Sequence, residues 1–87
     1  MKKVTIHRKI GCRYCEMAIE ILKSYNIDFT IQNYNPNEPE YEKAKQYLFN
    51  YGGMETFPQI YIDEKLLFGG YDKLERTSKS DFLDLIK

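Results

Sequence analysis

The chain has 87 residues, of which 43% are hydrophobic, and its 13 basic and 13 acidic side chains leave no net charge. This length suffices for a single small core, so we expect one domain over residues 1–87. The even mixture of charges argues against nucleic-acid binding, and no apolar run approaches the ~20 residues of a membrane-spanning helix. The charged start is not followed by the apolar run of a signal peptide, and we expect a cytoplasmic protein, in a compartment where thiols are kept reduced.

The first third of the chain has the pattern of a strand, a helix and a second strand. Alternating apolar residues predict a strand over residues 3–8, and Gly11 ends the extended stretch. Apolar residues then recur at helical spacing and predict a helix over residues 13–25, stopped by Asn26, a residue type that tolerates left-handed geometry. Alternation returns over residues 27–34. Because a helix joins the two strands, they should lie parallel in one sheet.

The middle of the chain predicts a second helix and two short strands. A loop rich in Asn and Pro precedes the helix, with Asn37 expected as its cap and Pro39 in its first turn. The helix should close at Gly52-Gly53, since glycine is the residue that most often ends a helix. Short alternating runs then predict strands over residues 59–63 and 66–68.

The last third of the chain should contain a turn and a helical tail. Asp63-Glu64-Lys65 is expected to form the turn between the two short strands, although it lacks the Asn-Gly or Asp-Gly pair typical of hairpins. Residues 71–87 predict a helical tail with a break near residues 77–80, where Ser80 or Ser78 caps the last turns. The element order βαβαββα indicates an α/β fold, with a four-stranded mixed sheet and helices on both faces.

The only two cysteines, Cys12 and Cys15, have C-x-x-C spacing at the expected start of the first helix. Two thiols at this spacing can exchange between a dithiol and a disulfide. Cys12 should be the nucleophile, because its sulfur faces the free backbone N–H groups of the helix start, which stabilise a thiolate. Cys15 lies one turn inside the helix and should resolve the mixed disulfide. Lys9 and Arg13 add positive charge near Cys12 and should favour its thiolate further.

Other interpretations of the two thiols fit less well. They could be an inert buried pair, or half of a structural zinc site, but such a site needs four ligands and His7 is the only histidine. His7 lies a few residues before Cys12, which makes a general base conceivable. Its alternation with Ile6 places it on the polar side of its strand, and thiol exchange requires no base. We therefore prefer the polar-side interpretation of His7.

Three short motifs, in this order, resemble those of the dithiol glutaredoxins: Cys12-Arg13-Tyr14-Cys15 before the first helix, Thr56-Phe57-Pro58 opening the third strand and Gly69-Gly70 closing the fourth. The resemblance spans nearly the whole chain and implies the thioredoxin-like fold in its small form. It also implies a cis peptide bond before Pro58, facing the thiols and leaving the Phe57 backbone free to pair with a bound peptide. A trans proline at the start of a strand is the alternative.

The resemblance further implies a glutathione groove beside the cysteines, with glutathione as the reducing co-substrate and no metal. The positions that match the family's glutathione-binding residues are Lys9, Tyr14, Lys45, Phe57, Pro58, Gly70, Tyr71 and Asp72. In this interpretation Lys45 reaches the glycine carboxylate of glutathione, and the Phe57 backbone holds the central cysteinyl part. Glutathione has carboxylates at both ends, so lysines beside the groove suit it. The alternative is that these lysines are ordinary solvated surface residues.

The chain departs from the glutaredoxin pattern in two places. Arg13 replaces the usual proline, which removes a stiffening residue but adds a charge that should stabilise the reduced form and make the disulfide more oxidising. After the double glycine, Tyr71-Asp72-Lys73 stands where many members have a hydroxyl residue and then an aspartate. The γ-glutamyl amine is therefore expected either to meet an aspartate shifted by one place or to be held less firmly.

The resemblance implies a monomeric, glutathione-dependent thiol–disulfide oxidoreductase in electron transport and cell redox homeostasis. It would reduce protein disulfides and protein–glutathione mixed disulfides, with ribonucleotide reductase as one candidate partner. One alternative is a reductant of ribonucleotide reductase that is coupled to thioredoxin reductase. Another is a [2Fe–2S] carrier, in which Cys12 of two subunits and two glutathione molecules supply four thiolates.

Overall fold

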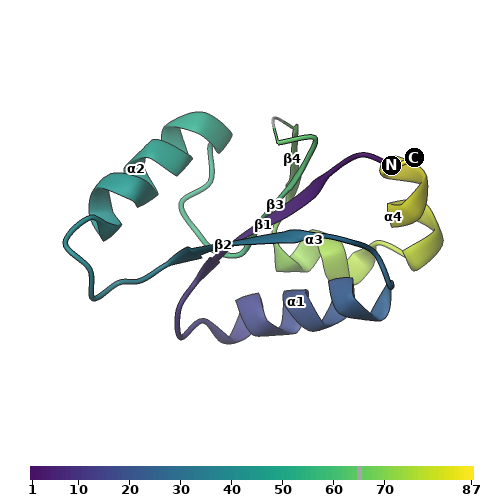
Figure 1. Cartoon of the computed structure of the whole chain (residues 1–87), viewed down its shortest axis with the longest axis horizontal. Helices are drawn as coiled ribbons and strands as arrows, with labels where there is room; N and C mark the ends of the chain where they lie inside the picture. Colours follow the sequence, from purple (N-terminus) through teal and green to yellow (C-terminus); the bar gives the residue numbers. More distant parts are fainter. Residues whose placement is uncertain (65) are drawn as a thin grey trace.

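The computed structural model describes residues 1–64 and 66–87, which contain four strands and four helices (Figure 1). In chain order the elements are β1 (Val4–Lys9), α1 (Arg13–Ser24), β2 (Thr30–Tyr34), α2 (Tyr41–Gly52), β3 (Gln59–Ile62), β4 (Leu66–Gly69), α3 (Tyr71–Arg76) and α4 (Lys79–Leu85). Across these described ranges, no helix has the length and apolar character needed to cross a membrane.

The strands form one mixed sheet in the order β2-β1-β3-β4. β1 and β2 run parallel, as expected for two strands joined by a helix, while β3 runs antiparallel to both β1 and β4. Helices α1 and α3 lie on one side of the sheet and α2 lies on the other (Figure 1). The predicted α/β architecture, with a four-stranded mixed sheet and helices on both faces, is confirmed.

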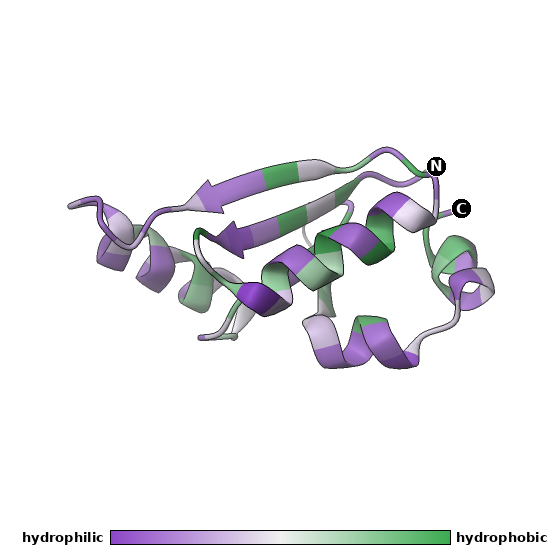
Figure 2. Ribbon diagram, turned by 90° about the horizontal axis from the view of Figure 1, so that it is seen from below, coloured by the Kyte–Doolittle hydropathy of each residue, from purple (hydrophilic) through white to green (hydrophobic). Residues whose placement is uncertain are grey.

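The hydrophobic core fills the space between the sheet and helices α1, α3 and α4. It consists of the buried side chains of Val4, Ile6, Ala18, Ile19, Leu22, Ile60, Ile62, Phe68, Leu74, Phe82 and Ile86. Hydrophobic and hydrophilic residues alternate around α1, so one side of the helix packs on the sheet and the other meets solvent (Figure 2). This packing fixes the axis of α1, and with it the position of the helix start that carries the cysteines.

The opposite face of the sheet is polar and aromatic where α2 covers it. Thr5 and His7 lie beneath α2, and Leu48 is the one buried residue that α2 contributes. Tyr61 is also buried, and its hydroxyl lies so close to Gly52 that a Cβ there would be 1.8 Å from the hydroxyl oxygen. Glycine at residue 52 is therefore required for α2 to approach the sheet.

The predicted start of the second helix is wrong. The helix begins at Tyr41, with Glu40 as an N-cap that makes no side-chain hydrogen bond. Asn37 lies before the helix and does not cap it. Its backbone N–H is instead part of a local turn, in which it donates to the Asn35 side-chain oxygen at 3.0 Å. This local turn is followed by another, in which the Tyr41 N–H donates to the Glu38 carbonyl. The intervening residues are thus held in turns, and the helix starts later than proline placement suggested.

Most of the remaining boundaries lie close to the sequence pattern, but β2 begins at Thr30 and not at residue 27 as predicted. Asn26 takes a left-handed conformation (φ 59°) just after α1, as predicted. Asp63 and Glu64 both have positive φ values, which suits a tight turn of the hairpin type, while the predicted turn residue Lys65 lies outside the described residues. The predicted break in the tail separates α3 from α4, and Ser78 caps α4 by accepting the Asp81 N–H at 3.1 Å.

Candidate active site

Cys12 lies at the junction between β1 and α1. Gly11 turns the chain with a φ of 83°, and Cys12 then adopts an extended conformation as the N-cap of α1. Its sulfur accepts a hydrogen bond from the Cys15 N–H at 3.3 Å, which makes Sγ the capping group of the helix. A helix N-terminus favours negative charge, so this position suits a nucleophilic thiolate. The Cys12 N–H donates to the Lys9 carbonyl at 3.3 Å, which fixes the residue from the other side.

Cys15 has a different environment on the inner side of α1. It is 0% exposed, whereas Cys12 is half-buried, and both are free thiols. Burial, helped by the hydrogen bond with the Cys12 side chain, raises the pKa of Cys15 to about 12. Cys15 is therefore a protonated thiol near neutral pH. Cys12 is thus the more accessible thiol and Cys15 the buried, protonated one. This is the difference expected if Cys12 is the nucleophile and Cys15 the resolving residue.

The loop before β3 faces Cys12. The Phe57–Pro58 peptide bond is cis, as the resemblance implied, and the Phe57 carbonyl oxygen lies 3.9 Å from the Cys12 sulfur. Phe57 lines a groove, so the Cys12 sulfur lies at the edge of that groove, beside the Phe57 carbonyl.

This groove runs from Tyr14 on α1 and the loop before β3 toward α3 and has a volume of about 510 Å³. Its lining residues are Tyr14, Met54, Thr56, Phe57, Pro58, Gly69, Gly70, Tyr71, Asp72, Lys73 and Arg76. The structure therefore brings together six residues that the resemblance assigned to glutathione: Tyr14, Phe57, Pro58, Gly70, Tyr71 and Asp72. The ring centroids of Tyr14 and Tyr71 are 5.3 Å apart. Because α1 and α3 each present one of these rings, the two helices jointly form one wall.

Gly70 lines the groove and lies close to the loop before β3. A Cβ at this position would lie 3.2 Å from the Pro58 carbonyl oxygen and 3.3 Å from the terminal carbon of Met54. The absence of a side chain therefore keeps this part of the groove open.

The structure places the two predicted lysines elsewhere. Lys9 is half-buried at the end of β1 and does not line the groove. Lys45 lies on α2, with its ammonium group 5.9 Å from the Tyr41 ring centroid, and it borders a separate hollow with Glu42 and Glu55. The cations that line the groove are Lys73 and Arg76 instead.

Sequence reasoning missed Lys73 and Arg76 as groove residues, together with Met54. Arg76 lies four residues after Asp72, and its Nε donates to the Asp72 carbonyl at 3.1 Å. The helical spacing between Asp72 and Arg76 is a sequence signal that could have identified Arg76. Met54 had no comparable signal, because its position depends on the irregular path between α2 and β3.

Arg13 occupies the first position of α1 and is exposed. Over the described ranges, it belongs to none of the ion pairs. Its neighbour on β1, Arg8, instead pairs with Glu16 in the first turn of α1. Arg13 thus presents its charge to solvent next to Cys12.

The described residues contain no group of three or more His, Cys, Asp or Glu side chains that could hold a metal ion.

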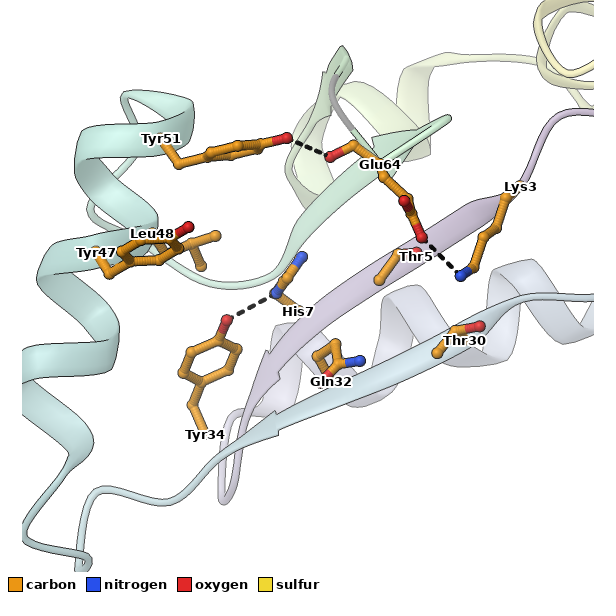
Figure 3. Close-up of a pocket in the computed structure, with 10 residues that line it drawn as sticks. All are labelled: Lys3, Thr5, His7, Thr30, Gln32, Tyr34, Tyr47, Leu48, Tyr51 and Glu64. Atoms are coloured by element: carbon orange, nitrogen blue, oxygen red, sulfur yellow. Dashed lines mark hydrogen bonds and ion pairs between the residues drawn. The ribbon is translucent and has the colours of Figure 1, made fainter.

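His7 belongs to a different cavity, on the α2 side of the sheet (Figure 3). This cavity has a volume of about 310 Å³ and is bordered at one end by the Lys3–Glu64 ion pair. His7 Nδ1 lies 2.8 Å from the Tyr34 hydroxyl, and burial lowers the pKa of His7. The imidazole is therefore neutral near pH 7 and engaged on the face of the sheet opposite the hydrophobic core.

Comparisons with known proteins agree with this geometry. Residues 4–67 match the glutaredoxin family model. The chain is 31% identical over 75 residues to Glutaredoxin-3 of Mus musculus, covering 86% of this chain but 21% of that protein. It therefore spans about a fifth of the length of this curated relative.

Solved structures show the same fold. The solution structure of the dithiolic glutaredoxin 2-C-Grx1 from Trypanosoma brucei brucei has a TM-score of 0.78 and 27% identity, covering 98% of this chain and 86% of that one. The buckwheat glutaredoxin–glutathione complex has a TM-score of 0.77 and 17% identity, covering 98% and 76% of the respective chains, which shows the fold alone. The chain belongs to the glutaredoxin family, and it has a thioredoxin-like fold with a pair of free thiols at the start of α1.

Proposed function

We propose that this domain is a glutathione-dependent reductase of protein disulfides and of protein–glutathione mixed disulfides. The observation that carries the proposal is the placement of Cys12 at the start of α1, where its sulfur lies 3.9 Å from the carbonyl of Phe57, a residue that lines the groove. A disulfide lying along the groove would present one sulfur to Cys12 while the rest of its glutathionyl part occupies the groove.

For a glutathionylated protein, the Cys12 thiolate attacks the glutathione sulfur of the mixed disulfide. The protein thiolate leaves and takes a proton, and Cys12 becomes glutathionylated. A second glutathione thiolate then attacks the glutathione sulfur bound to Cys12, which releases oxidised glutathione and restores the Cys12 thiolate. This route does not use Cys15.

For a protein disulfide, Cys12 first forms a mixed disulfide with the substrate. Cys15 loses its proton and attacks the Cys12 sulfur, which forms the Cys12–Cys15 disulfide and releases the second substrate thiolate. Two glutathione molecules then reduce this disulfide and leave as oxidised glutathione. Burial raises the pKa of Cys15, and the deprotonation of this thiol belongs to the resolving step and not to the initial attack by Cys12.

Charges along the groove support glutathione as the occupant. Glutathione carries two carboxylates and one ammonium group, and the groove offers the cations Lys73 and Arg76 together with the carboxylate of Asp72. The buckwheat complex is further support, since that protein of the same fold binds glutathione. We include ribonucleotide reductase among the candidate protein substrates, and we propose a cytoplasmic monomer as the working form.

The test is a coupled assay on a glutathionylated peptide, with glutathione, glutathione reductase and NADPH. Cys12→Ser should abolish turnover, whereas Cys15→Ser should retain most of it. Equal loss in both variants would contradict the assigned roles. Replacing the coupling system with thioredoxin reductase and NADPH should give no reduction of the oxidised protein. Reduction by that system alone would instead identify the thioredoxin-reductase-coupled reductant.

A further inference from the structure

The loop that faces Cys12 is held by a buried side chain from β3. Gln59 is 1% exposed, and its Nε2 donates to the carbonyls of Met54 at 3.0 Å and Thr56 at 3.2 Å. A primary amide has two N–H donors, so both are used on this loop. Met54 and Thr56 line the groove, which means that the Gln59 amide fixes the backbone of two groove residues.

The acceptor end of the same amide is fixed as well. The Tyr61 hydroxyl donates to Gln59 Oε1 at 3.0 Å, and this pair is buried. Tyr61 reaches this position because residue 52 is glycine, since a Cβ there would lie 1.8 Å from the hydroxyl oxygen. The amide therefore has one orientation in which its oxygen and both N–H groups are satisfied.

A second contact holds the loop at Phe57. The Tyr34 ring packs against the Phe57 ring with centroids 5.1 Å apart, and its hydroxyl is bonded to His7 Nδ1 at 2.8 Å (Figure 3). The loop is thus fixed from the side of the sheet that carries α2, while the substrate groove lies along its other side. The Cys12 backbone is held by α1 and by the Lys9 carbonyl, and its sulfur meets the loop at the Phe57 carbonyl, 3.9 Å away.

We propose that Gln59 is a positioning residue for the glutathione groove: its amide holds the Met54 and Thr56 carbonyls so that the loop from Met54 to Pro58 presents its backbone to the bound tripeptide. The inference rests on the proposed function of the groove. It assigns Gln59 to binding of the glutathionyl part and not to the reactivity of Cys12, because Gln59 contacts the loop and neither cysteine.

The experiment compares Gln59→Met, which removes the whole amide, with Tyr61→Phe, which removes only the hydrogen bond that orients it. The methionine has a similar length but cannot donate to the loop, whereas Tyr61→Phe leaves both Gln59 donors in place. In the coupled assay, Gln59→Met should raise the KM for a glutathionylated peptide by about tenfold. Without the hydrogen bonds from Gln59, the loop must be ordered when the peptide binds, and the loss of a buried hydrogen bond costs about that factor in an equilibrium constant. Tyr61→Phe should raise it by less than about threefold.

The rate of Cys12 alkylation by iodoacetamide separates positioning from general damage. Iodoacetamide needs no groove, so its rate with Gln59→Met, measured well below the unfolding temperature, should stay within about twofold of wild type. A KM in Gln59→Met that remains within about twofold of wild type, a larger rise in KM in Tyr61→Phe than in Gln59→Met, or a parallel fall in the alkylation rate would each overturn the proposal.

A measurement on the wild-type protein applies if Gln59→Met does not fold. The side-chain NH₂ protons of Gln59, followed by NMR, should exchange with solvent far more slowly than those of the exposed Gln32, and exchange at the rate of Gln32 would overturn the proposal. If the wild-type protein does not turn over the glutathionylated peptide, the proposed function fails first. The NH₂ exchange then reports separately on whether Gln59 holds the loop.

Discussion

The Cys12 sulfur accepts a hydrogen bond from the Cys15 N–H at 3.3 Å, so the proposed nucleophile caps the helix that contains its proposed resolving partner. The first turn of α1 leaves Cys12 half-buried and places Cys15 in the core, where Cys15 is 0% exposed. The chemical asymmetry of the pair is therefore a consequence of one helix start.

This asymmetry predicts different alkylation profiles for the two single-cysteine variants. In Cys12→Ser, Cys15 should react slowly with iodoacetamide, and its rate should keep rising with pH well above 9.0, the ordinary value of the pKa, because burial is the largest cause of the shift. In Cys15→Ser, Cys12 should react faster throughout the neutral range. Alkylation quenched at a series of times and analysed by mass spectrometry measures both rates. Equal rates for the two variants at neutral pH would contradict the predicted asymmetry.

Burial of His7 predicts a loss of stability in mild acid. Burial lowers the pKa of His7 in the folded chain, so protonation favours the unfolded state. The contribution of His7 is present above the ordinary pKa of 6.5 and is lost as the pH falls through the lower folded value. Urea unfolding at about pH 7.5 and about pH 5 should show a larger loss of unfolding free energy in wild type than in His7→Gln. The same loss in both proteins would assign the effect to other groups.

The tight contact at Gly70 predicts a defect in binding. In Gly70→Ala, the new Cβ would lie 3.2 Å from the Pro58 carbonyl oxygen and should narrow the groove, which raises the KM for a glutathionylated peptide. Gly53→Ala is the matched control, because a Cβ there meets nothing within 4 Å, while its φ of 79° makes the substitution strained. We expect the control to lower the melting temperature without changing KM. A raised KM in the control alone would refute the steric explanation.

The periodicity of the sequence predicted most of the fold, because the apolar faces of β1, α1 and β3 follow regular spacings and pack together. It did not predict the start of α2, where the Asn35 side chain stabilises a turn that competes with the helix. Nor did it predict the role of Gln59. A polar residue at the start of a strand usually faces solvent, and only the approach of Gly52 to Tyr61 shows why this one is buried.

The sequence pattern anticipated the positions of those motif residues that lie next to an element boundary. Tyr14, Pro58 and Gly70 lie at the ends of elements whose positions the pattern fixes, and the structure brings them into one groove. Lys45 lies on α2, whose placement over the sheet depends on tertiary contacts that spacing does not encode. The resemblance therefore gave no means of placing Lys45 relative to the groove.

The positions of the groove cations predict which basic residues matter for glutathione. Arg76→Gln should raise the KM for a glutathionylated peptide by about two- to fivefold, the effect of losing one partly exposed ion pair. Lys45→Gln should change it less, because Lys45 borders a different hollow. Added salt should weaken the Arg76 effect through screening. A larger effect of Lys45→Gln than of Arg76→Gln would restore the role that the resemblance gave to Lys45.

The exposed charge of Arg13 predicts a shift in reduction potential. Arg13 begins α1 beside Cys12 and, within the described ranges, forms none of the ion pairs, so its charge acts on the thiol site through space. Removing this charge should destabilise the reduced, thiolate-containing form and make the disulfide more reducing. Titration of the Cys12–Cys15 disulfide against mixtures of reduced and oxidised glutathione should therefore give a lower potential for Arg13→Pro. Arg13→Gln separates charge from backbone stiffness: the same shift in both variants attributes it to charge, whereas a shift in Arg13→Pro alone would attribute it to the proline ring.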